Sequence, residues 1–183
     1  FSARTIFIAG GVGSFQPRKL HLDGADKLED HFIHYRVQDP AIFKGRRVAI
    51  LGGGDSALDW ALALGPEAAA LTLVHRRDDY RAAPASVAQL KARAAAGAVE
   101  IIEAANATAL RLDGDRLTGL ELDLKDGGSR VLDVDHLLVF FGLSPKLGPI
   151  ADWGLTLHKK AITVDTEAFQ TNVPGIFAIG DIC

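Results

Sequence analysis

The sequence predicts an α/β fold in which a parallel sheet is joined to an antiparallel β-meander and is flanked by pieces of a second domain. Two patterns favour this fold. An apolar run, a glycine-rich turn, an amphipathic stretch and a second apolar run follow one another over residues 46–75, as in a βαβ unit. Farther along, three short β-like runs are separated by Asp113-Gly114 and by residues 126–128, whose Asp-Gly pairs are typical of hairpins.

The other elements can be placed in order along the chain. Asp39-Pro40 marks a turn or a helix start before the βαβ unit, and residues 14–45 are otherwise mixed and loop-like. Pro84 suits the first turn of a helix over residues 85–96, which Gly97 would end. Buried or half-buried strands are expected at 5–9, 32–35, 99–102, 107–112, 117–124, 129–134, 137–141, 161–164 and 176–179.

Composition narrows the classes of function. With 183 residues, 48% hydrophobic content and a net charge of −3, the chain suits one domain plus part of another, and it is a poor candidate for binding nucleic acid or a membrane surface. Cys183 is the single cysteine, so neither an internal disulfide nor a zinc site is expected, and a reducing cytoplasm is favoured. The chain begins at Phe1 and has no methionine, from which we expect it to be a piece of a larger protein.

The glycine-rich turn has the G-x-G-x-x-A form of a Rossmann-like dinucleotide fingerprint. Gly52 permits the tight turn out of the strand, Gly54 removes the Cβ that would block a pyrophosphate, and Ala57 lets the helix pack closely on the strand. Amide groups of the first helical turn would then face the anion. We expect Asp55 or Ser56 to cap that helix. The candidate pyrophosphate-binding residues are therefore Gly52, Gly53, Gly54, Asp55, Ser56 and Ala57.

The second strand of the βαβ unit ends in cations, where a ribose-binding carboxylate is usual. Guanidinium groups match the geometry of phosphate and stay charged, so this end of the strand favours NADP(H) over NAD(H). Two charged hydrogen bonds of roughly 1.5–3 kcal/mol each would provide the preference. Alternatively, Asp78 and Asp79 pair with the arginines in a solvated cluster, or one of them binds the ribose. The candidate 2′-phosphate ligands are His75, Arg76, Arg77 and Arg81.

Longer motifs carry a resemblance to a family. The runs GGGDSA at 52–57 and HRRDDYR at 75–81, and TNVPGIFAIGD at 171–181, resemble segments of the two-dinucleotide-domain flavoprotein reductases, in particular the low-molecular-weight thioredoxin reductase group. This resemblance implies that the arginine motif binds the 2′-phosphate of NADP(H) and that Phe141 and Gly142 approach the nicotinamide half. It also implies that Gly180 and Asp181 contact FAD in a complete enzyme.

One departure decides the subgroup. Thioredoxin reductases carry C-x-x-C just before the NADPH-domain strand, whereas this chain has HYRVQDP at 34–40, and disulfide exchange requires a thiolate. The stretches at 52–60, 147–150 and 152–155 are similar to those of the thioredoxin-reductase-type ferredoxin/flavodoxin–NADP reductases. The resemblance then implies hydride transfer between NADPH and FAD, electron exchange with ferredoxin or flavodoxin, and a homodimer when the protein is complete. The cofactors carry that chemistry, so no catalytic side chain and no metal ligand is named.

The resemblance also implies a division of the chain: residues 1–40 as flavin-domain edge and hinge, 41–143 as the NADP(H)-binding domain, and 144–183 as the return to the flavin domain. The only early glycine motif, at 10–13, is followed by residues 14–17, which break a helix. We therefore expect this chain to bind NADPH but little or no FAD. Two alternatives stay open: a non-enzymatic NADP(H)-binding module, and a thioredoxin-reductase-like flavoprotein with another electron acceptor.

Overall fold

A computed structural model describes residues 2–11, 17–143, 146–159 and 161–183, and it divides into two compact units. Unit 2 comprises residues 19–142, and unit 1 combines residues 1–18 with 143–183. In the described residues each unit has two sheets, and two buried clusters lie in unit 2 and one in unit 1.

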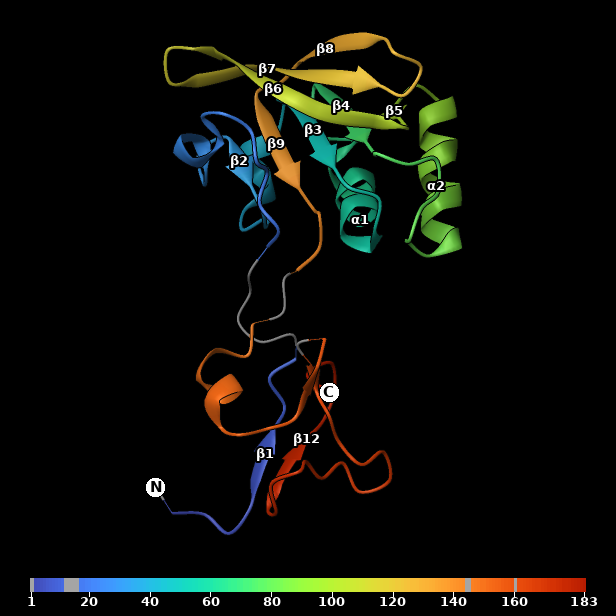
Figure 1. Cartoon of the computed structure of the whole chain (residues 1–183). Coiled ribbons are helices and arrows are strands. Elements are labelled where there is room, and N and C mark those ends of the chain that lie inside the picture. The colour runs from blue at the N-terminus through green and yellow to red at the C-terminus, as the bar shows by residue number, and fades with distance from the viewer. Residues whose placement is uncertain (1, 12–16, 144–145, 160) are drawn as a thin grey trace. The chain divides into compact units, whose positions relative to one another are not determined.

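Unit 2 is built on a parallel sheet of five strands (Figure 1). The strand order is β2-β9-β3-β4-β5, and each neighbouring pair is parallel. Helix α1 connects β3 to β4 and helix α2 connects β4 to β5, so the predicted βαβ unit is confirmed. The bounds are β2 Ile33–His34, β3 Arg47–Leu51, α1 Asp55–Leu64, β4 Ala70–Val74, α2 Pro84–Ala95, β5 Glu100–Ile102 and β9 His136–Val139.

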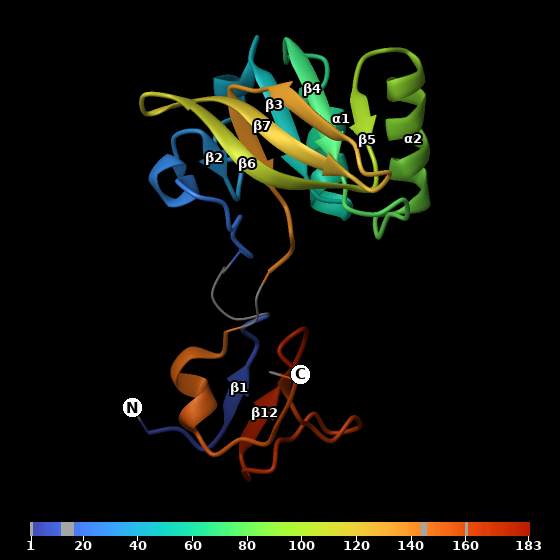
Figure 2. The same cartoon turned by 45° about the horizontal axis from the view of Figure 1, so that its top comes forward.

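Successive side chains of a strand point to opposite faces of the sheet, and this alternation separates two buried layers in unit 2. On β3, Val48 and Ile50 pack with the helices, whereas Ala49 and Leu51 pack with the meander on the opposite face. The meander is the antiparallel sheet β6-β7-β8, in which Asp113 ends β6 and a tight turn leads into β7. Its layer and the helical layer cover opposite faces of the parallel sheet (Figures 1 and 2). The bounds are β6 Ala105–Asp113, β7 Arg116–Leu124 and β8 Ser129–Asp133.

The first boundary of unit 2 differs from the one that the sequence predicts. Residues 19–40, which the sequence places with a flavin-domain edge and hinge, lie in unit 2. They form the 3₁₀ turn η1 and strand β2, which pairs with β9, and they lead into the 3₁₀ turn η2 at Pro40, where Asp39 accepts a hydrogen bond from the Ala41 amide (2.9 Å). The physical reason for the difference is burial, because this segment contributes apolar side chains to the meander-side core: Leu20, Ala25, Leu28 and Ile33. The bounds are η1 Ala25–Leu28 and η2 Pro40–Phe43.

Unit 1 is smaller and contains little regular structure. Strands β1 and β12 pair in parallel, and β10 and β11 form a short antiparallel pair. Five buried side chains form its core, namely Ile8, Leu155, Ile162, Ala178 and Ile182. The bounds are β1 Ile6–Ile8, η3 (a 3₁₀ turn) Gly148–Asp152, β10 Leu157–His158, β11 Ala161–Ile162 and β12 Ile176–Ala178.

Candidate functional site

The carboxyl ends of three neighbouring strands of unit 2 bring the candidate NADP(H) residues together. The chain runs from β3 through β4 to β5 on one side and returns in β9 on the other side of β3, so the strand order reverses between β3 and β9. Ligands of open α/β sheets bind at such a switch point, outside the carboxyl ends of the strands. Two backbone bonds hold these ends together: the Gly52 amide donates to the Val74 carbonyl (3.1 Å) and the Phe140 amide to the Leu51 carbonyl (2.8 Å).

At each of the three positions of the turn after β3, glycine is favoured for a different physical reason. A Cβ added to Gly52 would lie 2.6 Å from the Phe140 carbonyl oxygen and 3.1 Å from Ala57 Cβ, so only glycine lets the turn approach both. A Cβ on Gly53 would overlap the imidazole ring of His75. A Cβ on Gly54 would meet no protein atom within 4 Å, so this position borders open space. An anion could therefore approach the turn at Gly54, which fits a pyrophosphate.

Helix α1 begins without a side-chain cap. Gly54 is its N-cap residue, and Asp55 is already the first helical residue. The expectation that Asp55 or Ser56 caps this helix is therefore wrong, because a capping side chain must come from the residue before the first helical one. Ala57 is fully buried against the sheet, as its small size requires. The first-turn amides are left without a side-chain cap, the condition in which a helix start can bind an anion.

The basic segment after β4 lies beside the glycine turn. The Arg81 amide donates to the Gly53 carbonyl (2.9 Å), and the half-buried ring of His75 packs over Gly53. Arg76, Arg77 and Arg81 are exposed, and within the described parts of the chain none of them lies within 4.0 Å of a carboxylate oxygen. The alternative in which Asp78 and Asp79 pair with these arginines finds no support in this geometry.

A tyrosine supports the histidine of this segment. The rings of His75 and Tyr80 stack with centroids 5.4 Å apart, and the Tyr80 hydroxyl donates to Glu103 Oε1 (2.8 Å). Burial, followed by the hydrogen bond to Glu103, raises the pKa of Tyr80 well above its usual value, so the phenol stays protonated at any working pH. Sequence reasoning missed both Tyr80 and Glu103. Only the place of Tyr80 inside the arginine motif could have drawn attention to it.

The end of β9 gives the third wall of the site. Phe141 is 43% exposed and Gly142 has a positive φ of 88° with open space where a Cβ would be. These two residues follow Phe140, whose carbonyl contacts the glycine turn, so they lie at the same edge of the sheet as the turn. Because Phe141 is exposed, its ring is available to contact a flat heterocycle.

The candidate FAD residues belong to unit 1. Gly180 and Asp181 follow β12, and Gly180 has a φ of 78°, which glycine adopts without strain. Gly10 and Gly11 follow the parallel partner strand β1, while the rest of the 10–13 motif lies outside the described residues. Unit 1 thus places two glycine-containing strand ends side by side.

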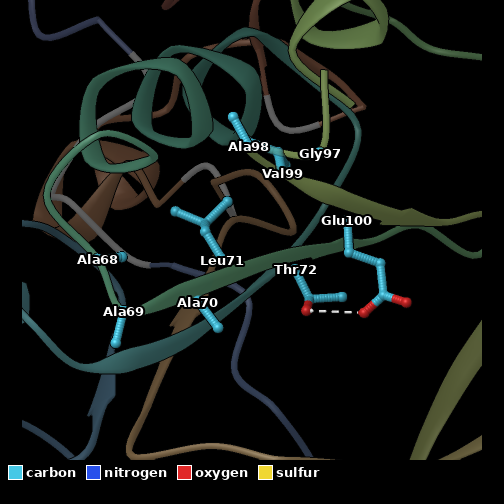
Figure 3. Close-up of a pocket in the computed structure, with 9 residues that line it drawn as sticks. All are labelled: Ala68, Ala69, Ala70, Leu71, Thr72, Gly97, Ala98, Val99 and Glu100. Carbon is cyan, nitrogen blue, oxygen red and sulfur yellow. Dashed lines mark hydrogen bonds between the residues drawn. The ribbon is translucent and has the colours of Figure 1, made fainter. Parts of the chain in front are cut away.

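The opposite, amino edge of the unit 2 sheet carries other features. There Asp135 accepts hydrogen bonds from the Arg47 guanidinium (2.7 Å) and from the Arg47 amide (2.9 Å). These bonds, the one from the guanidinium above all, hold the pKa of this carboxyl far below its usual value. A hollow of about 220 Å³ opens beside the starts of β4 and β5 (Figure 3). Its polar side chains are Thr72 and Glu100, joined by a 3.2 Å hydrogen bond. The hollow is far along the strands from the glycine turn and lacks cations, so it does not suit a dinucleotide. Its lining is Ala68, Ala69, Ala70, Leu71, Thr72, Gly97, Ala98, Val99 and Glu100.

Two features are absent from the residues that the structure describes. No helix there is both long and apolar enough to cross a membrane. No cluster of three or more histidine, cysteine, aspartate or glutamate side chains there could hold a metal ion.

Fold and site together define a Rossmann-like domain of the dinucleotide-binding class. The chain belongs to the pyridine nucleotide-disulphide oxidoreductase family, whose model matches residues 1–183. It is 54% identical over 182 residues to ferredoxin–NADP reductase 2 of Cupriavidus taiwanensis and 53% identical over 186 residues to ferredoxin–NADP reductase of Methylibium petroleiphilum. These matches cover 100% of this chain and 49% and 50% of the relatives, so the chain spans about half their length.

Solved structures agree with this assignment. The thioredoxin reductase of T. acidophilum matches with a TM-score of 0.87 and 26% identity, covering 100% of this chain and 58% of that one. The thioredoxin reductase of Lactococcus lactis matches with a TM-score of 0.81 and 28% identity, covering 97% and 57%. The resemblance to thioredoxin-reductase-type ferredoxin–NADP reductases and the predicted fold class are therefore confirmed.

Proposed function

We propose that this chain is the NADP(H)-binding part of a flavin-dependent oxidoreductase that moves a hydride between NADPH and FAD and exchanges electrons with ferredoxin or flavodoxin. The observation that carries the proposal is the exposed cluster of Arg76, Arg77 and Arg81, which has no carboxylate partner in the described residues and lies beside an open glycine turn. The names of the relatives, ferredoxin–NADP reductase, support the reaction class.

Each group of candidate residues at the carboxyl ends of the unit 2 strands would bind a different part of the coenzyme. The uncapped start of α1 and the turn at Gly54 would bind the pyrophosphate, which NADPH and NADH share. The arginines, with His75 held over Gly53, would bind the 2′-phosphate, which only NADPH carries. Phe141 and Gly142 would face the nicotinamide half. The bound nicotinamide and flavin supply the hydride and electron chemistry, while this chain supplies binding and orientation.

Unit 1 fits the edge of a flavin domain. Its parallel strand ends carry Gly10 and Gly180-Asp181, and the relatives have about twice the length of this chain. We therefore assign Gly180 and Asp181 to FAD binding in a complete protein and expect little FAD binding by these 183 residues. Ferredoxin or flavodoxin as acceptor, a homodimer and a cytoplasmic location belong to the same proposal.

Titration of the chain with NADPH and with NADH tests the coenzyme assignment. Arg76→Ala/Arg77→Ala should lower the preference for NADPH on the order of 100-fold and leave NADH affinity nearly unchanged, since two charged hydrogen bonds are lost. Gly54→Ala should weaken both coenzymes alike, because its Cβ enters the shared pyrophosphate space. Its φ of −101° and ψ of 178° suit alanine, so the fold should persist.

The matched control removes two other exposed arginines. Arg46 precedes β3 at the amino edge, and Arg93 lies in the last turn of α2, so Arg46→Ala/Arg93→Ala changes the net charge equally at a distance from the glycine turn. NADPH affinity should also fall more steeply with salt than NADH affinity. An unchanged preference in the Arg76/Arg77 variant, or an equal loss in the control, would contradict the proposal.

The alternatives have their own discriminating measurements. A non-enzymatic module would bind NADPH with these residues but would not be part of a flavin-binding protein. In that case a longer protein that contains this chain would purify without FAD. A related flavoprotein with another acceptor would reduce a quinone, for example, but neither ferredoxin nor flavodoxin. Reduction assays with the longer protein separate these cases.

A further inference from the structure

The position of Asp55 is at odds with a purely anion-binding role. It is the first residue of α1, at the end of the helix where the proposed pyrophosphate would lie, and a carboxylate there repels phosphate. Its Oδ1 accepts a 2.8 Å hydrogen bond from the Ala83 amide, 28 residues later in the chain. The side chain is therefore directed at the segment that carries the arginines, and its role is set by that contact.

Ala83 closes the basic segment at residues 75–83, which we call the arginine loop. At the start of this loop the His75 amide donates to the Ile102 carbonyl (2.9 Å), and at its end Ala82 is buried in the helical core. Two further bonds join the loop to the region of the glycine turn. The Arg81 amide donates to the Gly53 carbonyl (2.9 Å), and the Ala83 amide donates to Asp55 Oδ1 (2.8 Å). A third bond, from His75 Nε2 to the Asp79 carbonyl (2.9 Å), folds the loop on itself.

We propose that Asp55 is a positioning residue for coenzyme selection: its carboxylate anchors the end of the arginine loop so that the arginines stay beside the glycine turn. This inference rests on the proposed NADP(H) function and adds a residue that acts without touching the 2′-phosphate. Of these two bonds to the turn region, the one to Asp55 uses a side-chain acceptor, so a substitution at Asp55 removes it without changing any residue of the arginine loop. Ala83 is also the N-cap residue of α2, so the same bond fixes where that helix begins.

Three variants separate the hydrogen bond from the charge. Asp55→Ala removes both the acceptor and the charge, whereas Asp55→Asn keeps an acceptor oxygen and removes the charge. Asp59→Ala is the matched control, because Asp59 is an exposed carboxylate one turn farther along α1 with no hydrogen bond or ion pair in the part of the chain that the structure describes. For each variant the dissociation constants of NADPH and NADH are measured. The readout is the preference ratio, which is the Kd of NADH divided by the Kd of NADPH.

Asp55→Ala should lower the preference ratio about fivefold, so that NADPH is preferred less strongly, as expected for the loss of one hydrogen bond. Asp55→Asn should keep that ratio within about twofold while both coenzymes bind equally well or better, since a repelling charge is gone. Asp59→Ala should leave the ratio as it is. A ratio unchanged in Asp55→Ala, or reduced as much in Asp55→Asn, would overturn the role of Asp55.

A second measurement needs no coenzyme. In the free protein, amide hydrogen exchange in peptides covering residues 76–83 should accelerate in Asp55→Ala but not in Asp55→Asn, while exchange in β3 stays as in the parent chain. Unchanged exchange in the loop would overturn the anchor even if coenzyme affinity changed. If the parent chain itself showed no preference for NADPH, the proposed function would fail together with the selection role, whereas a preference that survives Asp55→Ala removes the Asp55 inference alone.

Discussion

The parallel strands of the two units are buried to different degrees. In unit 2 the parallel sheet is covered by helices on one face and by the meander on the other, and β3 carries fully buried Ala49 and Ile50 on its two faces. In unit 1 the parallel pair β1–β12 carries Phe7, which is 66% exposed and stacks on Phe177 with ring centroids 5.1 Å apart. Ile6 and Ile179 of the same region are also exposed.

Parallel sheets in folded proteins are normally buried on both faces, because their backbone and apolar side chains need cover. Unit 2 meets this rule with its own residues, whereas unit 1 leaves the large apolar side chains Ile6 and Phe7 of β1 exposed. We infer that unit 2 carries its own stability and that unit 1 is the weaker of the two. The glycine turn and the arginine loop both belong to unit 2, the unit that we infer to be the more stable.

The first prediction measures this difference directly, and it has the largest expected effect. Native-state hydrogen exchange should give a free energy of opening for Ala49 and Ile50 amides that exceeds that of Ile162 and Ala178 by about 3 kcal/mol or more, because the smaller unit buries less apolar surface. Ile162 and Ala178 amides make backbone bonds of 2.7 and 3.0 Å, so hydrogen bonding alone would protect them well. Equal opening energies would show that both units unfold as one, contrary to the inference.

The second prediction compares two leucines of the meander. Leu122 is fully buried and Leu112 is 45% exposed, so Leu122→Ala should lower the free energy of unfolding of unit 2 by about 2–5 kcal/mol and Leu112→Ala by about 0.5 kcal/mol or less. Denaturant unfolding is followed by Trp60 fluorescence in a Trp153→Phe background, since Trp60 packs against the helical core.

The same pair of variants also sharpens the comparison between the units. If unit 1 has a separate core, the exchange of the Ile162 amide should be the same in Leu122→Ala as in the parent chain. Faster exchange at Ile162 in that variant would mean that the stability of unit 1 depends on the core of unit 2.

The elements with local patterns could be predicted from the sequence. The βαβ unit, the meander and the helix starting at Pro84 all follow from hydrophobic period and turn residues, and the structure confirms them. The glycine turn and the arginine motif are also local, which is why the candidate site could be named before the fold was known. That the site binds NADP(H) stays a prediction.

Contacts between distant residues could not be predicted in this way. Strand β2 has two residues, and Leu20 and Leu28 follow no regular period, so the inclusion of residues 19–40 in unit 2 depends on tertiary packing alone. The bond from Asp55 to Ala83 joins residues 28 positions apart, and the wrong expectation of a helix cap arose because the residue type suits both roles. Burial of His34 beside His136, 102 positions apart, leaves no trace in a single sequence.

That histidine pair gives the last and smallest prediction. His34 Nε2 and His136 Nδ1 share a 3.2 Å hydrogen bond in unit 2, and burial, followed by the charge of His34, lowers the pKa of His136 to about 4. Burial lowers the pKa of His34 as well. An unfolded histidine takes up its proton near pH 6.5, so between about pH 6.5 and 4 the unfolded chain binds more protons than the folded one, and unit 2 loses stability as the pH falls. Because His136 is only partly buried, we expect a loss of about 1–2 kcal/mol over this range.

Urea unfolding of unit 2, followed by Trp60 at several pH values, measures this loss. His136→Gln should make the dependence between pH 6.5 and 4 shallower, whereas His158→Gln in unit 1 should leave it unchanged, because that exposed histidine lies outside unit 2. The pair Arg47–Asp135 would act only at lower pH, because the pKa of Asp135 is held far below its usual value. A pH dependence that stays equally steep in His136→Gln would assign the acid sensitivity of unit 2 to groups other than this pair.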